Sequence, residues 1–136
     1  MTKQFLLTVG ILGSTGVIFG AFGSHLLNEN ISASNLGNWN LAVMYQMIHT
    51  LALLAITFMN RYVKRGYLNT IYYLFVLGIF LFCGSLYISS ISELTGIEIG
   101  VLKYSAPLGG LLLIAGWLFI IQSGIAYQHQ KRSSRH

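Results

Sequence analysis

Four long apolar stretches constrain this chain more than any other feature. They run over residues 5–24, 41–59, 71–90 and 108–127. A helix of about 20 residues, rising about 1.5 Å per residue, spans the roughly 30 Å hydrocarbon core of a bilayer. Open strands would leave unpaired amides in lipid, so helices are expected. The sequence predicts an all-α fold, a bundle of four transmembrane helices forming a single membrane domain over residues 1–136.

The composition agrees with a lipid environment. Hydrophobic residues make up 54% of the chain and charged residues only 8%, whereas about a quarter of a soluble domain is charged. The net charge is +5, but the Lys and Arg residues lie in loops and ends beside the apolar stretches. That placement indicates a role in membrane orientation and argues against a nucleic-acid partner.

The positive residues are divided unequally between the two sides of the predicted bundle. Only Lys103 falls on one side. Seven fall on the other: Lys3, Arg61, Lys64, Arg65, Lys131, Arg132 and Arg135. Because positive residues are retained in the cytoplasm, both termini are expected there. The basic tail, residues 128–136, is expected to be frayed. Its Lys131, Arg132 and Arg135 could bind anionic lipid headgroups weakly, but the sequence alone does not decide whether they do.

The first apolar stretch has a second interpretation, a cleaved signal peptide. Lys3, the apolar run and the small-residue sequence Ala21-Phe22-Gly23 resemble the three regions of such a peptide. The run is long for a signal, and its glycines suit helix packing. We therefore favour a retained first helix, and an intact N-terminus in the mass of the purified protein would decide between the two.

Polar residues near the apolar stretches predict where helices begin. Asn38 and Asn40 could cap the second helix, Asn69 the third and Ser105 the fourth, where Pro107 suits the first turn. No internal repeat interrupts this series of helices. One bundle without a second domain is therefore expected.

Glycines line one face of the first predicted helix. Gly13, Gly16, Gly20 and Gly23 are spaced by three, four and three residues, so they share a stripe, and Gly16 with Gly20 forms a small-xxx-small pair. The pattern predicts close packing against another helix, in the same bundle or in a second copy. A pore or a backbone that a ligand approaches is the alternative.

Tyr45, Gln46 and His49 form the most informative polar cluster. Their offsets of four and three place them on one face of the second helix. An ionisable residue inside a membrane is by default a functional hypothesis. A neutral imidazole that hydrogen-bonds to Gln46, to Tyr45 or across helices would instead stabilise the bundle by about 0.6 to 2 kcal/mol. We favour the structural role.

The sequence gives little reason to expect a cofactor or a metal. Haem held between His25 and His49 is conceivable, but the two residues differ in depth by about 15 Å at helical rise. His25 and Glu29 alone are too few ligands for a metal site. The single cysteine, Cys83, allows neither an intramolecular disulfide nor a cysteine cluster.

Transport and catalysis also lack positive support. The acidic residues Glu29, Glu93 and Glu98 all fall in the two outer loops, whereas four-helix multidrug exporters depend on a carboxylate inside the membrane. No nucleophile has a recognisable base in a known motif, and no phosphate-binding glycine loop follows a strand. Enzymatic activity is therefore not expected.

Four motifs in order resemble a known family. They are Gly20-Ala21-Phe22-Gly23-Ser24-His25, Tyr45-Gln46-x-x-His49, Gly84-Ser85-Leu86-Tyr87, and Pro107-Leu108-Gly109-Gly110 with Gly116-Trp117. Together they resemble the domain of unknown function 423 family, which includes bacterial inner-membrane proteins and the animal transmembrane protein 256. The resemblance covers nearly the whole chain. Ser24 replaces the alanine expected in many members, a small-for-small change. The resemblance implies four membrane helices, the first one retained, and no agreed activity.

These observations favour a structural or accessory protein of the bacterial cytoplasmic membrane. The glycine stripe suggests that it self-associates or packs against a larger membrane complex. The alternative is a bundle that binds or transports a small molecule or lipid, centred on His49, with Tyr45, Gln46 and His25 as further candidates.

Overall fold

The computed structural model describes residues 2–97 and 100–133 and is helical throughout its regular structure. Its long helices are α1 (Thr2–Phe22), α2 (Ala33–Phe58), α3 (Arg65–Ser90) and α5 (Ser105–Ser133). The shorter elements are the π-helical turn η1 (Gly23–Leu27), the 3-10 turns η2 (Met59–Arg61) and η3 (Gly100–Tyr104), and the one-turn helix α4 (Ser92–Thr95). Within the described ranges, no residue lies in a strand.

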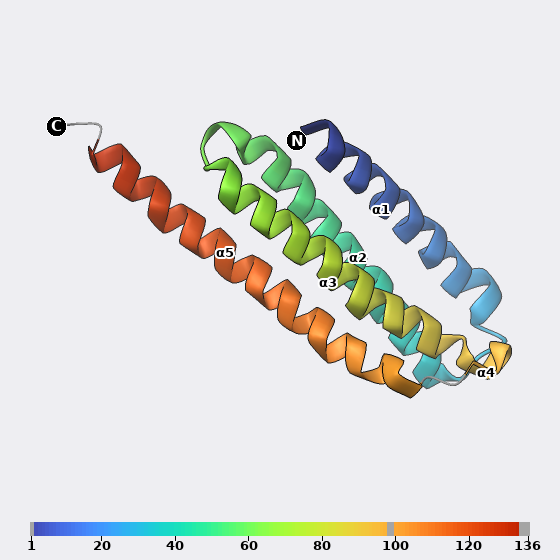
Figure 1. Ribbon diagram of the computed structural model, residues 1–136. Helices are drawn as coiled ribbons and strands as arrows, with labels where there is room; N and C mark the ends of the chain where they lie inside the picture. The colour runs from blue at the N-terminus through green and yellow to red at the C-terminus, as the bar shows by residue number, and fades with distance from the viewer. Residues whose placement is uncertain (1, 98–99, 134–136) are drawn as a thin grey trace.

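The long helices lie side by side and alternate in direction (Figure 1). α1 packs on α2, α2 on α3 and α3 on α5, so α1 and α5 occupy opposite edges. The start of α1, the turn between α2 and α3, and the end of α5 lie at one end of the bundle. α4 and η1 lie at the other. The short connections explain why consecutive helices are antiparallel neighbours.

All of the long helices could cross a bilayer. Their apolar windows have mean hydropathies of 1.7 to 2.1, which confirms the prediction of four spans. In these windows α2 and α3 bury 39% and 44% of their residues, against 17% for α1 and 22% for α5. The two edge helices therefore present most of their apolar surface to the membrane.

Two helices begin earlier than predicted. α2 starts after Ser32, whose Oγ accepts a hydrogen bond from the Asn35 N–H at 3.4 Å. Asn38 and Asn40 lie inside that helix, so their prediction as caps was wrong. Asn69 likewise lies within α3, which begins at Arg65. The 26 residues of α2 span about 39 Å at helical rise, which is more than the roughly 30 Å hydrocarbon core and close to the about 40–45 Å of a bilayer with its headgroups.

α5 extends beyond its predicted range at both ends. It begins at Ser105, with Pro107 in the first turn as expected, and runs to Ser133. Part of the polar tail is therefore helical instead of frayed. Glu98 of the predicted outer loop and Arg135 of the basic tail lie outside the described residues.

Glycines allow α3 and α5 to approach each other closely. A Cβ atom added at Gly109 would clash with the backbone of Phe82, and one added at Gly116 would clash with the Phe75 ring. One added at Gly78 would lie 2.5 Å from Leu113 Cδ2. Small residues let helices approach in lipid, where packing replaces the hydrophobic effect between helices. This approach brings α5 within reach of His49 on α2.

Candidate functional site

The glycine stripe of α1 faces α2 inside the chain. Added Cβ atoms at Gly16 and Gly23 would lie 2.6 Å from Met47 Sδ and 2.8 Å from Trp39 Cδ1. Gly13 and Gly20 also point at α2, with ordinary contact distances of 3.8 and 3.6 Å. The stripe thus packs α1 against α2, and it is not available to a second copy.

Gln46 joins three helices through its side-chain amide. Its Nε2 donates to the Leu12 carbonyl at 2.8 Å and to Thr15 Oγ1 at 2.9 Å, both on α1. Its Oε1 accepts from the Tyr87 hydroxyl of α3 at 2.9 Å. Gln46 is only 3% exposed. Both amide hydrogens and the amide oxygen are therefore engaged within the protein.

His49 makes a separate set of contacts, with α3 and α5. Its Nδ1 lies 2.7 Å from the Tyr45 carbonyl oxygen, and its Nε2 accepts a hydrogen bond from Trp117 Nε1 at 3.2 Å. The Phe75 ring meets the imidazole edge to face, with 5.3 Å between ring centroids. The imidazole is 4% exposed. Helices α2, α3 and α5 thus enclose His49 with protein groups.

The cluster predicted on one face of α2 therefore divides into two. Tyr45 stacks on His49, with 5.8 Å between ring centroids, and packs against Phe82. Gln46 points instead toward α1 and Tyr87. Consecutive residues such as Tyr45 and Gln46 point in directions about 100° apart around the helix axis. Neighbouring helices surround α2 over a wide enough arc to cover both directions.

His25 lies apart from this cluster. It is exposed in η1, close to Gly23, which contacts Trp39 of α2. His49 lies ten residues further along α2, about 15 Å at helical rise, so the structure does not bring the two histidines together. Glu29 is exposed as well. Among the described residues, no group of three or more His, Cys, Asp or Glu could hold a metal ion.

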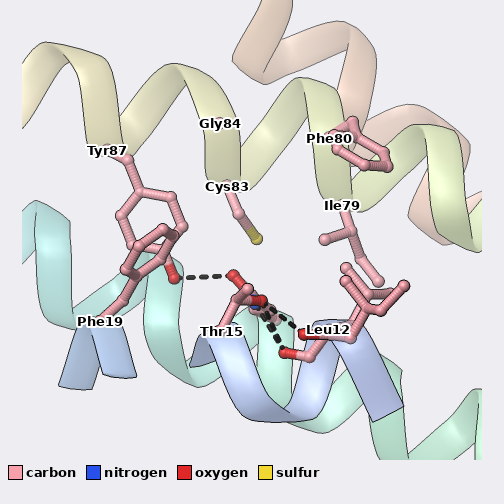
Figure 2. A pocket seen from close by; sticks show the side chains of 10 residues that line it. Leu12, Thr15, Phe19, Ile79, Phe80, Cys83, Gly84 and Tyr87 are labelled. Atoms are coloured by element: carbon pink, nitrogen blue, oxygen red, sulfur yellow. Dashed lines mark hydrogen bonds between the residues drawn. The ribbon is translucent and has the colours of Figure 1, made fainter. Parts of the chain in front are cut away.

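A cavity of about 270 Å³ lies between α1 and α3, over the Gln46 hydrogen bonds (Figure 2). In Figure 2, Cys83 and Ile79 point from α3 toward Thr15 and Leu12 of α1. The remaining lining residues are Ile11, Phe19, Gln46, Phe80, Gly84 and Tyr87. Among residues with described side chains, no buried side-chain nitrogen or oxygen atom lacks a hydrogen-bond partner. The buried polar groups of the cavity are used internally, and its interior suits an apolar occupant.

A second hollow continues this space toward the start of α1. It has a volume of about 450 Å³ and shares Ile11 with the cavity. Its other lining residues are Lys3, Gln4, Leu7, Thr8 and Tyr72. We call the two hollows together the α1–α3 groove.

Aromatic and hydroxyl contacts connect α1 to α3 at both ends of the cavity. At one end Thr8 Oγ1 and the Tyr72 hydroxyl are hydrogen-bonded at 2.6 Å, and Phe5 stacks on Tyr72 with 4.2 Å between centroids. At the other end Phe19 meets Tyr87 edge to face at 4.8 Å. These contacts hold α1 and α3 in place on either side of the cavity.

Sequence reasoning missed the cavity and most of its lining. Gly84 and Tyr87 belonged to a motif that carried the family resemblance, and Cys83 was considered only for a disulfide or a cysteine cluster. Their shared helical face was the available signal. A space between two helices depends on how both are placed, and the pattern of one helix does not encode it.

These features define a small four-helix integral membrane protein. A family model described as a protein of unknown function (DUF423) matches residues 19–110, and the chain belongs to this family. The UPF0382 membrane protein YwdK of Bacillus subtilis is 34% identical over 92% of this chain and 98% of its own length. The UPF0382 inner membrane protein YgdD of Escherichia coli K12 is 33% identical over 92% of both chains. No solved structure matches the chain.

Proposed function

We propose that this protein is a non-enzymatic accessory component of the bacterial cytoplasmic membrane that self-associates or packs against a larger membrane complex. Both of its ends face the cytoplasm in this proposal, as the distribution of positive residues favours. The Escherichia coli relative is named an inner membrane protein, which supports the same location for this chain.

The outer face of α1 carries the proposal. Gly10 and Ser14 form a small-xxx-small pair there, and a Cβ atom added at Gly10 would have no neighbour within 4 Å. Both residues are exposed, and the Ser14 hydroxyl makes no hydrogen bond within the described part of the chain. Small residues and a hydroxyl at membrane depth favour contact with another helix. Because the inner glycines already face α2, this outer pair is the surface left for association.

The alternative, a binding or transport bundle centred on His49, has less support. Both imidazole nitrogens have protein partners, and the α1–α3 cavity is lined by Gln46 and not by His49. A ligand-binding role for this chain would therefore use the space between α1 and α3 instead of the surroundings of His49.

Measuring the size of the purified full-length chain in lipid nanodiscs tests self-association. We expect more than one copy per disc at high protein-to-lipid ratio, and at least a roughly tenfold weaker association for Gly10→Leu. Gly124→Leu is the matched control, because Gly124 is also exposed without a neighbour within 4 Å of an added Cβ. A wild-type chain that stays monomeric and copurifies with no partner would contradict the proposal.

A further inference from the structure

We propose that the α1–α3 groove binds one anionic phospholipid, with an acyl chain in the cavity and the headgroup phosphate beside Lys3. The first argument is the chemistry of the cavity. The polar side chains around the cavity already have hydrogen-bond partners within the protein. Gln46 bonds to Thr15 and Tyr87, and Thr15 also donates to a backbone carbonyl. An apolar cavity does not hold water well. Hydrocarbon is the occupant that this lining favours.

The cavity lies where hydrocarbon is available. Ile11 and Phe80, which belong to its lining, are 64% and 65% exposed. Both residues lie within candidate membrane spans, so their exposed surfaces face acyl chains. The cavity can therefore fill sideways from the bilayer, without a route through water.

The polar end of the groove matches a headgroup. Lys3 and Gln4 are exposed at the start of α1, and they line the hollow that meets the cavity at Ile11. Among the described residues that line the two hollows, Lys3 alone is charged. An ammonium group at the membrane surface attracts anionic lipids, an effect worth about a fivefold change in binding per residue. This charge selects an anionic phospholipid over a neutral one.

The length of the groove matches one leaflet. Lys3 and Thr15 are separated along α1 by about 18 Å at helical rise. Half of the hydrocarbon core is roughly 15 Å thick. A phospholipid with its phosphate at Lys3 would therefore place its acyl chain beside Thr15 and Cys83.

A lipid titration followed by native mass spectrometry tests the cavity. The full-length protein in detergent is offered phosphatidylglycerol or phosphatidylethanolamine. We expect one tightly retained phosphatidylglycerol per chain. Gly84→Leu should weaken its binding at least about tenfold, the equivalent of two displaced methylenes, because Gly84 lines the cavity and an added Cβ meets nothing within 4 Å. Gly124→Leu, on the far edge helix, should bind as the wild type does.

A charge variant tests the headgroup position without altering the core. Lys3→Gln should weaken phosphatidylglycerol binding about fivefold and leave phosphatidylethanolamine binding unchanged. The control is Lys64→Gln, because Lys64 is exposed at the same end of the bundle and does not line the groove. The proposal would be overturned by equal losses of phosphatidylglycerol affinity in both lysine variants or by equal affinity of the wild type for the two lipids. Wild-type binding by Gly84→Leu would overturn it as well.

Discussion

His49 illustrates how partners determine the state of a side chain. The Trp117 indole nitrogen can only donate a hydrogen bond, and the Tyr45 carbonyl can only accept one. With these partners at Nε2 and Nδ1, the imidazole carries its proton on Nδ1 and is neutral. Neither nitrogen is left for a substrate or a proton relay. His49 therefore links α2 to α5.

Trp117→Phe tests this link, because it keeps an aromatic ring and removes the indole N–H. We expect a loss of about 0.6 to 2 kcal/mol in unfolding free energy, measured by titrating the micelle-bound protein with a denaturing detergent. In a double-mutant cycle with His49→Phe, the two losses should be non-additive by a similar amount. Strictly additive losses would show that the hydrogen bond contributes nothing.

Gln46 should contribute more to the unfolding free energy than His49, because it bonds to two other helices. Gln46→Leu keeps a similar side-chain volume but removes three hydrogen bonds, and we expect a loss of about 2 kcal/mol at about 0.6 kcal/mol per bond. Tyr87→Phe removes only the bond to Gln46 Oε1 and should cost about 0.6 kcal/mol. The same detergent titration measures the unfolding free energy of both variants. A loss for Tyr87→Phe that equals or exceeds the loss for Gln46→Leu would contradict this prediction.

At the scale of elements, the approach of α3 to α5 depends on a missing side chain. An added Cβ at Gly109 would meet the backbone of Phe82, which cannot move aside as a flexible side chain can. Gly109→Ala should therefore destabilise the protein by about 1–3 kcal/mol. Gly124→Ala is the control on the same helix, because its Cβ would meet nothing within 4 Å. Equal stabilities of the two variants in detergent titration would contradict the backbone contact.

The helices themselves could be predicted because bilayer thickness sets their length. Their ends were less predictable, since α2 is longer than the hydrocarbon core requires and is capped by Ser32, ahead of Asn38 and Asn40. The α1 glycines were recognised by spacing alone. Gly78 and Gly116 lie on different helices, and only the packing of the two helices shows that they share an interface.

The candidate site was predictable only in part, for the same reason. Residues 45, 46 and 49 were expected to act together, but α2 packs against several helices. Gln46 bonds to α1, whereas His49 bonds to α5. The α1–α3 groove depends on contacts between distant residues, such as Thr8 with Tyr72 and Phe19 with Tyr87. Those pairings are a property of the whole molecule.

At the scale of the whole molecule, orientation follows from charge and not from packing. The structure places the start of α1 and the end of α5 at one end of the bundle, and six of the seven Lys and Arg residues in the described ranges belong with that end. We therefore expect a C-terminal green fluorescent protein fusion to fluoresce and a C-terminal alkaline phosphatase fusion to be inactive in bacterial cells, because the first reporter matures in the cytoplasm and the second outside it.

Replacing Lys64 and Arg65 with glutamine removes two positive charges next to α3 and should reduce the fluorescent fraction, since positive residues in short loops set the orientation. The matched control replaces two neutral residues of the same turn, Asn60 and Tyr62, with alanine. An active phosphatase fusion of the wild-type chain would reverse the assigned topology while leaving the helix packing unchanged.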